Sequence, residues 1–106
     1  MLEQIISQHL FQLTQNGVLH RGLSEEEAIS IAEQTVTAIA KKSKDLASNI
    51  ENPNINLLFQ QISQLTIGKI LGGADPLKSV EESANSIKKI LLKSKIITTE
   101  SGLQDY

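Results

Sequence analysis

The second quarter of the chain has apolar residues at alternating spacings of three and four, and this periodicity constrains the fold more than any other feature. The spacing produces one continuous stripe along an α-helix, three heptads long. Ser24 and Glu27 form a capping box at its start. Asn52 stands before Pro53 and ends it, because a residue before proline disfavours the helical conformation. The stripe comprises Ile29, Ala32, Val36, Ile39, Ser43, Leu46 and Ile50.

Three further segments have helical spacing and local start or stop signals. Gly17 and Gly72 are typical of residues that follow a helix end, and Asp75 with Pro76 is typical of a helix start. We therefore expect helices over residues 2–15, 24–51, 55–71 and 76–95. Outside the long helix, the expected core positions are Leu2, Ile5, Ile6, Leu10, Leu13, Ile55, Leu58, Phe59, Ile62, Leu65, Ile70, Leu77, Val80, Ala84, Ile87, Ile90 and Leu91.

Four amphipathic helices with short connections predict an all-α fold, a four-helix antiparallel bundle. We expect one domain over residues 1–96 and a flexible tail over residues 97–106, where small and polar residues dominate. The loop over residues 18–23 leaves two arrangements open. The first helix packs within the monomer, or it packs on another subunit so that dimerisation completes or extends the bundle.

Composition excludes several classes of function. The 106 residues contain no cysteine, which rules out disulfides, thiolate catalysis and cysteine-ligated zinc. The formal net charge of -2 offers no overall attraction to nucleic acid or anionic lipid. Neither a signal peptide nor a membrane-spanning stretch is visible, so we expect a cytoplasmic protein. We expect no cofactor.

The segment between Glu51 and Asp75 has a single charged residue, Lys69, and is otherwise rich in amides and hydroxyls. On a helical wheel its apolar residues fall on two sides, which is unusual for a helix that faces water. Depletion of charge is typical of the core of a protein interface. We therefore predict that this helix binds a protein partner, most simply a second copy of the chain. The predicted interface comprises Leu57, Gln60, Gln64, Ile67, Gly68 and Leu71.

A second patch is predicted on the last helix, where two apolar residues fall opposite the core stripe among lysines. Such a patch is suited to an acidic partner or a membrane surface. A solvated lysine face is the plainer interpretation. An aromatic residue on the outer side of the first helix extends the surface. The secondary patch comprises Phe11, Lys78, Lys88, Lys89, Leu92 and Ile96.

Catalytic and metal-binding motifs are missing from the sequence. His9 lies within the apolar stripe of the first helix, where we expect a half-buried residue that is sensitive to pH. His20 precedes three glutamates, but no ligand spacing such as H-x-x-x-H occurs. No nucleophile elbow or phosphate-binding glycine loop is found. We therefore expect neither a catalytic nor a metal site, and not an enzyme.

The resulting hypothesis is a non-enzymatic protein–protein interaction module that forms a homodimer. Three alternatives stay open. One is an immunity or antitoxin-type protein that neutralises a toxin or bacteriocin, an analogy of size and architecture only. Another is weak binding of nucleic acid through the lysines of the last helix, which the missing arginines and aromatics there disfavour. The last is a ligand-binding protein or enzyme with a pocket near His9 or Lys69.

Overall fold

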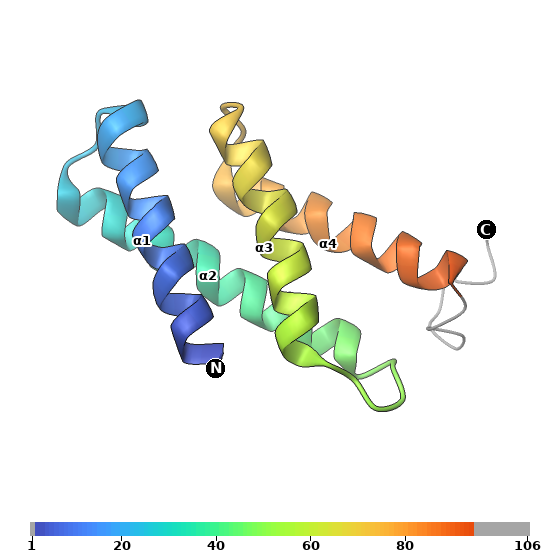
Figure 1. Cartoon of the computed structure of the whole chain (residues 1–106). Helices are drawn as coiled ribbons and strands as arrows, with labels where there is room; N and C mark the ends of the chain where they lie inside the picture. Colours follow the sequence, from blue (N-terminus) through green and yellow to red (C-terminus); the bar gives the residue numbers. More distant parts are fainter. Residues whose placement is uncertain (1, 95–106) are drawn as a thin grey trace.

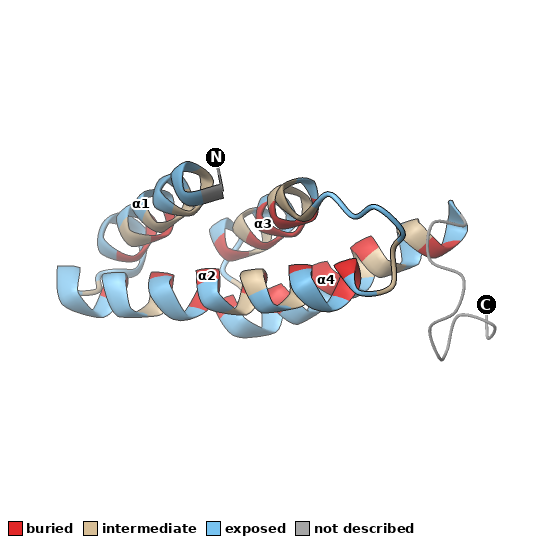
Figure 2. Ribbon diagram, turned by 90° about the horizontal axis from the view of Figure 1, so that it is seen from below, coloured by how far each residue is buried: buried red, intermediate tan, exposed pale blue. Residues whose placement is uncertain are grey.

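The computed structural model describes residues 2–94, and this part of the chain folds into a four-helix bundle, as the sequence predicts. In Figure 1, α1 and α3 run upward in the nearer layer, and α2 and α4 run obliquely across behind them. Figure 2 shows two layers, with α1 and α3 in one and α2 and α4 in the other. The core lies between the layers around Phe59, Ile39 and Ile62, which are fully buried. The helices are α1 (Leu2–Arg21), α2 (Glu25–Ala47), α3 (Ile55–Leu71) and α4 (Pro76–Lys93).

Local caps set three of the four helix starts. The hydroxyl of Ser24 accepts the backbone N–H of Glu27 at 3.2 Å, and the Glu27 carboxylate accepts the Ser24 N–H in return, also at 3.2 Å. The Glu27 carboxylate also accepts a hydrogen bond from the Ser24 hydroxyl, and the bonds that it accepts from the N–H and the hydroxyl of Ser24 lower the pKa of Glu27. Asn54 caps α3 and Asp75 caps α4 in the same way, with Pro76 as the first helical residue. The predicted starts are therefore confirmed.

The predicted end of the first helix is wrong, because α1 continues through Gly17 to Arg21. Gly17 lies inside the helix where α1 crosses α2, against Ala28. The turn occurs instead at Gly22, whose φ of +69° is left-handed. The N–H of Leu23 then donates to the carbonyl of Gly17 at 3.0 Å. The packing of two helices, which a single segment does not reveal, determines which glycine ends α1.

Two other helices end earlier than predicted. The helical ladder of α2 stops at Ala47, four residues before the expected end. Asn49 and Ile50 then form tighter turns, and Asn52 adopts a left-handed φ of 55°. α4 ends at Lys93 with Ser94 as its cap. The bounds of α3 match the prediction. The predicted tail, residues 97–106, lies outside the described residues.

Several residues expected in the core are exposed instead. The molecule measures 44 × 28 × 16 Å, so it is only two helices thick. Each helix is therefore covered mainly on one side, and the broader apolar arcs extend beyond the covered surface. The exposed members of those arcs are Ile29, Leu65, Leu77 and Ile90.

Candidate interaction surface

Charged residues are divided unequally between the two layers. α1 and α3 together have three charged residues among 37, and these are Glu3, Arg21 and Lys69. α2 and α4 have 14 among 41. Glu3 and Arg21 lie at the two ends of α1, and Lys69 pairs with Glu82 of α4 at 3.6 Å. The outer surface of α1 and α3 between these ends therefore has no ionised side chain apart from Lys69.

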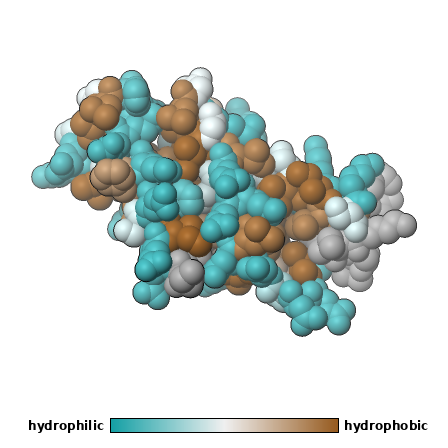
Figure 3. All heavy atoms as spheres, viewed as in Figure 1, coloured by the Kyte–Doolittle hydropathy of each residue, from teal (hydrophilic) through white to brown (hydrophobic). Residues whose placement is uncertain are grey.

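We give the name uncharged face to one set of accessible residues without charge on the outer side of α1 and α3. Figure 3 looks onto it and shows hydrophobic side chains interspersed with polar ones. Many of the polar groups are amides, which hydrogen-bond without carrying charge. The uncharged face comprises Gln4, Gln8, Phe11, Gln15, Val18 and Leu19 of α1 with Leu57, Gln60, Gln64, Ile67, Gly68 and Leu71 of α3.

All six residues of the predicted interface on α3 belong to this face. Leu57 and Leu71 are 47% and 63% exposed, and Gln64 is exposed between them. Gly68 is also exposed, with no atom within 4 Å of the position a Cβ would take. Gln60 and Ile67 are half-buried, and Ile67 packs against the core. The interface prediction itself stays a prediction, but its residues share one accessible stripe.

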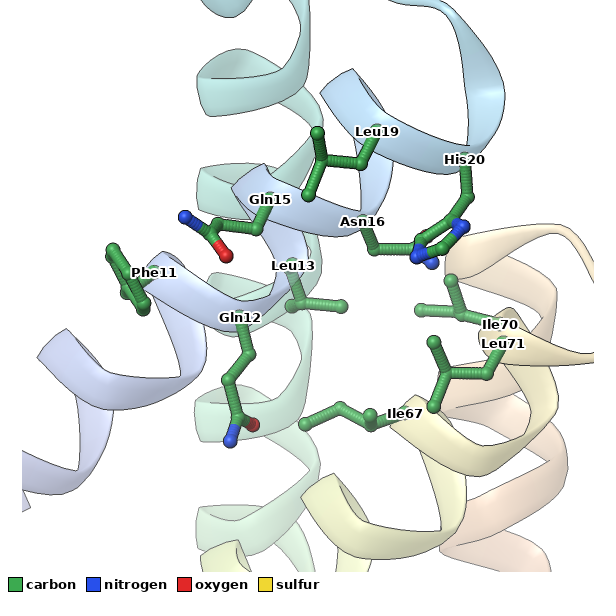
Figure 4. A pocket seen from close by; sticks show the side chains of 10 residues that line it. All are labelled: Phe11, Gln12, Leu13, Gln15, Asn16, Leu19, His20, Ile67, Ile70 and Leu71. Atoms are coloured by element: carbon green, nitrogen blue, oxygen red, sulfur yellow. The ribbon is translucent and has the colours of Figure 1, made fainter.

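A groove of about 330 Å³ separates the C-terminal parts of α1 and α3. These helices contact each other far less than either contacts its partner in the second layer. Figure 4 shows side chains from both helices around the groove. No aspartate, glutamate, lysine or arginine lines it. The lining residues are Phe11, Gln12, Leu13, Gln15, Asn16, Leu19, His20, Ile67, Ile70 and Leu71.

The secondary patch is not one surface. Leu92 is only 6% exposed and packs in the core, because α4 presents that side to the bundle. Ile96 lies outside the described residues. Lys78 and Lys89 are exposed on α4, and Lys88 is half-buried. Phe11 instead lines the groove with residues of α3. Phe11 and these α3 residues come together because α1 and α3 share one layer and α4 lies in the other.

His9 lies where α1 meets α3, with its ring 5.8 Å from the buried ring of Phe59. It is half-buried, as expected from its place in the apolar stripe. Its buried Nδ1 has no well-formed hydrogen bond among the described residues. Burial lowers the pKa of His9, and the nearby backbone of Ile5 partly offsets this effect. The fold therefore favours the neutral imidazole.

This preference predicts that stability falls in mild acid. The unfolded chain takes up a proton near the ordinary histidine pKa of 6.5, and the folded chain does so only at lower pH. The contribution of neutral His9 to the free energy of unfolding is thus fully present above pH 6.5 and declines as the pH falls below 6.5. Thermal unfolding between pH 7.5 and 5 should show this decline, and His9→Leu should remove most of it. His20→Gln is the matched control; a decline that disappears in that variant instead would contradict the assignment.

Side chains that could bind a metal are not clustered in the part of the chain that the structure describes. Among residues 2–94, no three histidine, aspartate or glutamate side chains lie close enough together to hold a metal ion. The groove is lined by neither His9 nor Lys69, the two residues around which a pocket was considered. No helix in that part of the chain is both long and apolar enough to span a bilayer.

Comparison of the chain with family models, with curated proteins and with solved structures found no match. The site must therefore be interpreted from its own geometry. Its main feature is the accessible layer of α1 and α3, which has almost no charge and contains a groove between the C-terminal parts of these two helices.

Proposed function

We propose that this chain is a non-catalytic protein-interaction module that pairs with a second copy of itself through the uncharged face. The observation that supports the proposal is the division of charge, three residues among 37 in one layer and 14 among 41 in the other. A surface in water ordinarily uses charged side chains, as the α2 and α4 layer does. Interface cores are depleted of charge and retain aromatic and apolar groups.

A second copy suits this face better than a charged partner. Electrostatic complementarity attracts proteins to partners of opposite charge, and the uncharged face has no charged side chains that could attract such a partner. The same property removes like-charge repulsion when the face meets its own copy. In a two-fold dimer both subunits use the same patch, so a neutral patch is self-compatible. Amides such as Gln60 and Gln64 supply both donors and acceptors to such a contact.

The lysines of α4 support nucleic-acid binding less well. Lys78, Lys88 and Lys89 share their helix with Glu81 and Glu82. The Nζ of Lys42 in α2 lies 3.7 Å from a carboxylate oxygen of Glu81, so this layer mixes positive and negative side chains. A phosphate backbone needs an uninterrupted basic surface. We therefore favour the uncharged face over the lysines as the contact surface.

The test compares two leucine-sized residues on opposite layers. Leu71 on the uncharged face is 63% exposed and Ile90 on α4 is 57% exposed, so a glutamate at either position should leave the monomer folded. We expect wild-type protein to dimerise in sedimentation equilibrium. Leu71→Glu should raise the dimer Kd about 30-fold or more, because a charge is buried against an apolar surface.

Ile90→Glu is the matched control and should leave the Kd unchanged. Circular dichroism should show the same helix content in both variants. Leu71 is preferred over Ile67 for this experiment, because Ile67 also packs against the core and a charge there would disturb the monomer. A wild-type chain that stays monomeric at millimolar concentration, or equal effects of the two substitutions, would refute the proposal.

A further inference from the structure

The groove between α1 and α3 is lined by residues of both helices and has apolar and polar parts. One wall is apolar and comes from Ile67, Ile70 and Leu71, and Leu13 contributes from α1. Gln12, Asn16 and His20 supply polar groups to its lining (Figure 4). An apolar pocket with a few amides at its edge suits a side chain that is large and hydrophobic. The question is which group fills it.

Among the described residues, Phe11 is the best candidate for a side chain that fills such a groove. It is 63% exposed, whereas Phe59 is buried in the core. Figure 4 shows its ring directed away from the centre of its own groove, beside Gln15. Phe11 therefore lines the edge of the groove without filling it. Aromatic side chains that enter a partner's pocket are the residues that most often dominate the affinity of an interface.

Phe11 belongs to a row of exposed residues along α1, which we call the ridge, and its spacing is typical of helices that pack against a partner helix. Its members alternate at four and three residues, so they form one straight stripe along α1. All are exposed and none is charged, and no aspartate, glutamate, lysine or arginine lines the groove either. The predicted stripe of α3 has the same alternation. The ridge consists of Gln4, Gln8, Phe11, Gln15 and Val18.

We infer that Phe11 of each copy enters the groove of a second copy and packs against Leu71 there. This inference rests on the proposed function, since it requires the uncharged face to be the dimer interface. Phe11 and the groove lie on the same face, so a two-fold axis placed between them would carry each ring to the other subunit's groove. Such a contact is reciprocal and closes at two subunits.

The test uses complementary variants in trans. In a Phe11→Lys dimer or a Leu71→Glu dimer, both copies of the contact are damaged, and each variant alone should dimerise about 30-fold or more weakly than wild type. A mixed dimer of the two retains one intact Phe11–Leu71 contact and pairs the new lysine with the new glutamate. Mixing should therefore restore association to within about threefold of wild type, closer than one intact contact alone would give, measured by sedimentation of a fluorescently labelled variant.

The control mixes Phe11→Lys with Leu57→Glu, which places a glutamate near the other end of the same α3 stripe. This mixture also keeps one intact Phe11–Leu71 contact, but its lysine meets Leu71 and stays unpaired, so it should associate more weakly than the first mixture. Equal association of the two mixtures would mean general attraction between opposite charges and would overturn the inference. Absence of rescue in the first mixture also overturns it, while leaving the uncharged face as the interface if Leu71→Glu still dissociates the dimer. A monomeric wild type would overturn both proposals, and a Phe11→Lys variant that dimerises normally would overturn this one alone.

Discussion

Gly17→Ala will destabilise the protein, although it removes a glycine from the interior of a helix. In an unhindered helix the change is favourable by about 1 kcal/mol, because alanine has the higher helix propensity. At position 17 a Cβ would lie 2.8 Å from the Cβ of Ala28 and 3.3 Å from a methyl carbon of Leu23. Relief requires α1 and α2 to move apart. We expect a net loss of about 1–3 kcal/mol in the free energy of unfolding, measured by urea denaturation.

Gly68→Ala is the matched control for this prediction. A Cβ at Gly68 would meet no atom within 4 Å, so the variant should be more stable by about 0.5–1 kcal/mol. Both substitutions are best measured in the Leu71→Glu background, so that association does not contribute. Adding Ala28→Gly to Gly17→Ala should recover part of the loss, as a double-mutant cycle would show. Stabilisation by Gly17→Ala equal to that of Gly68→Ala would refute the close crossing of α1 and α2.

Thr66→Val is the substitution from which we expect the largest gain in stability. The Thr66 side chain is fully buried in α3, and its hydroxyl has no hydrogen-bond partner among the described residues. A buried unpaired polar group costs about 1–3 kcal/mol, and valine has nearly the same shape without that group. We therefore expect an increase of about 1–2 kcal/mol in the free energy of unfolding. Thermal and urea denaturation would both measure it.

Thr35→Val is the comparison for Thr66→Val. Thr35 is as deeply buried, but its hydroxyl donates to the carbonyl of Ile31 at 2.7 Å. Its replacement should therefore gain less than the replacement of Thr66. A loss of stability in Thr66→Val would mean that the hydroxyl has a partner in solution, such as a trapped water. Ser63 and Ser83 have the same status as Thr66 and offer a second pair of positions.

The sequence predicted helix starts well and helix ends poorly, for a physical reason. Starts depend on caps within four residues, such as Ser24 with Glu27, and these signals are local. The end of α1 depends on whether Gly17 or Gly22 adopts a left-handed conformation. Gly17 packs against Ala28 of α2, and α1 continues as a helix through this contact. Such contacts are tertiary and cannot be inferred from either segment alone.

Helical periodicity predicts which side of a helix is apolar but not how much of that side a neighbour covers. Leu65 and Ile90 fit the core periodicity and are nevertheless exposed, while Leu92 lay outside it and is buried. The stripe of α3 was predicted because one charge in a long segment is conspicuous. The same signal exists in α1, where no charged residue occurs between Glu3 and Arg21. Only the folded chain places those residues beside α3, so the sequence alone does not predict that the two segments form one surface.

Because most of the charge lies in one layer, a dimer formed through the other layer should respond differently to different salts. Ionic strength weakens contacts between exposed charges, with a screening length of about 8 Å in physiological salt. A dimer formed through α1 and α3 would bury almost no ion pair, so added sodium chloride would change its affinity little. Strongly hydrated salts such as sulfate would strengthen it, since they favour burial of apolar surface.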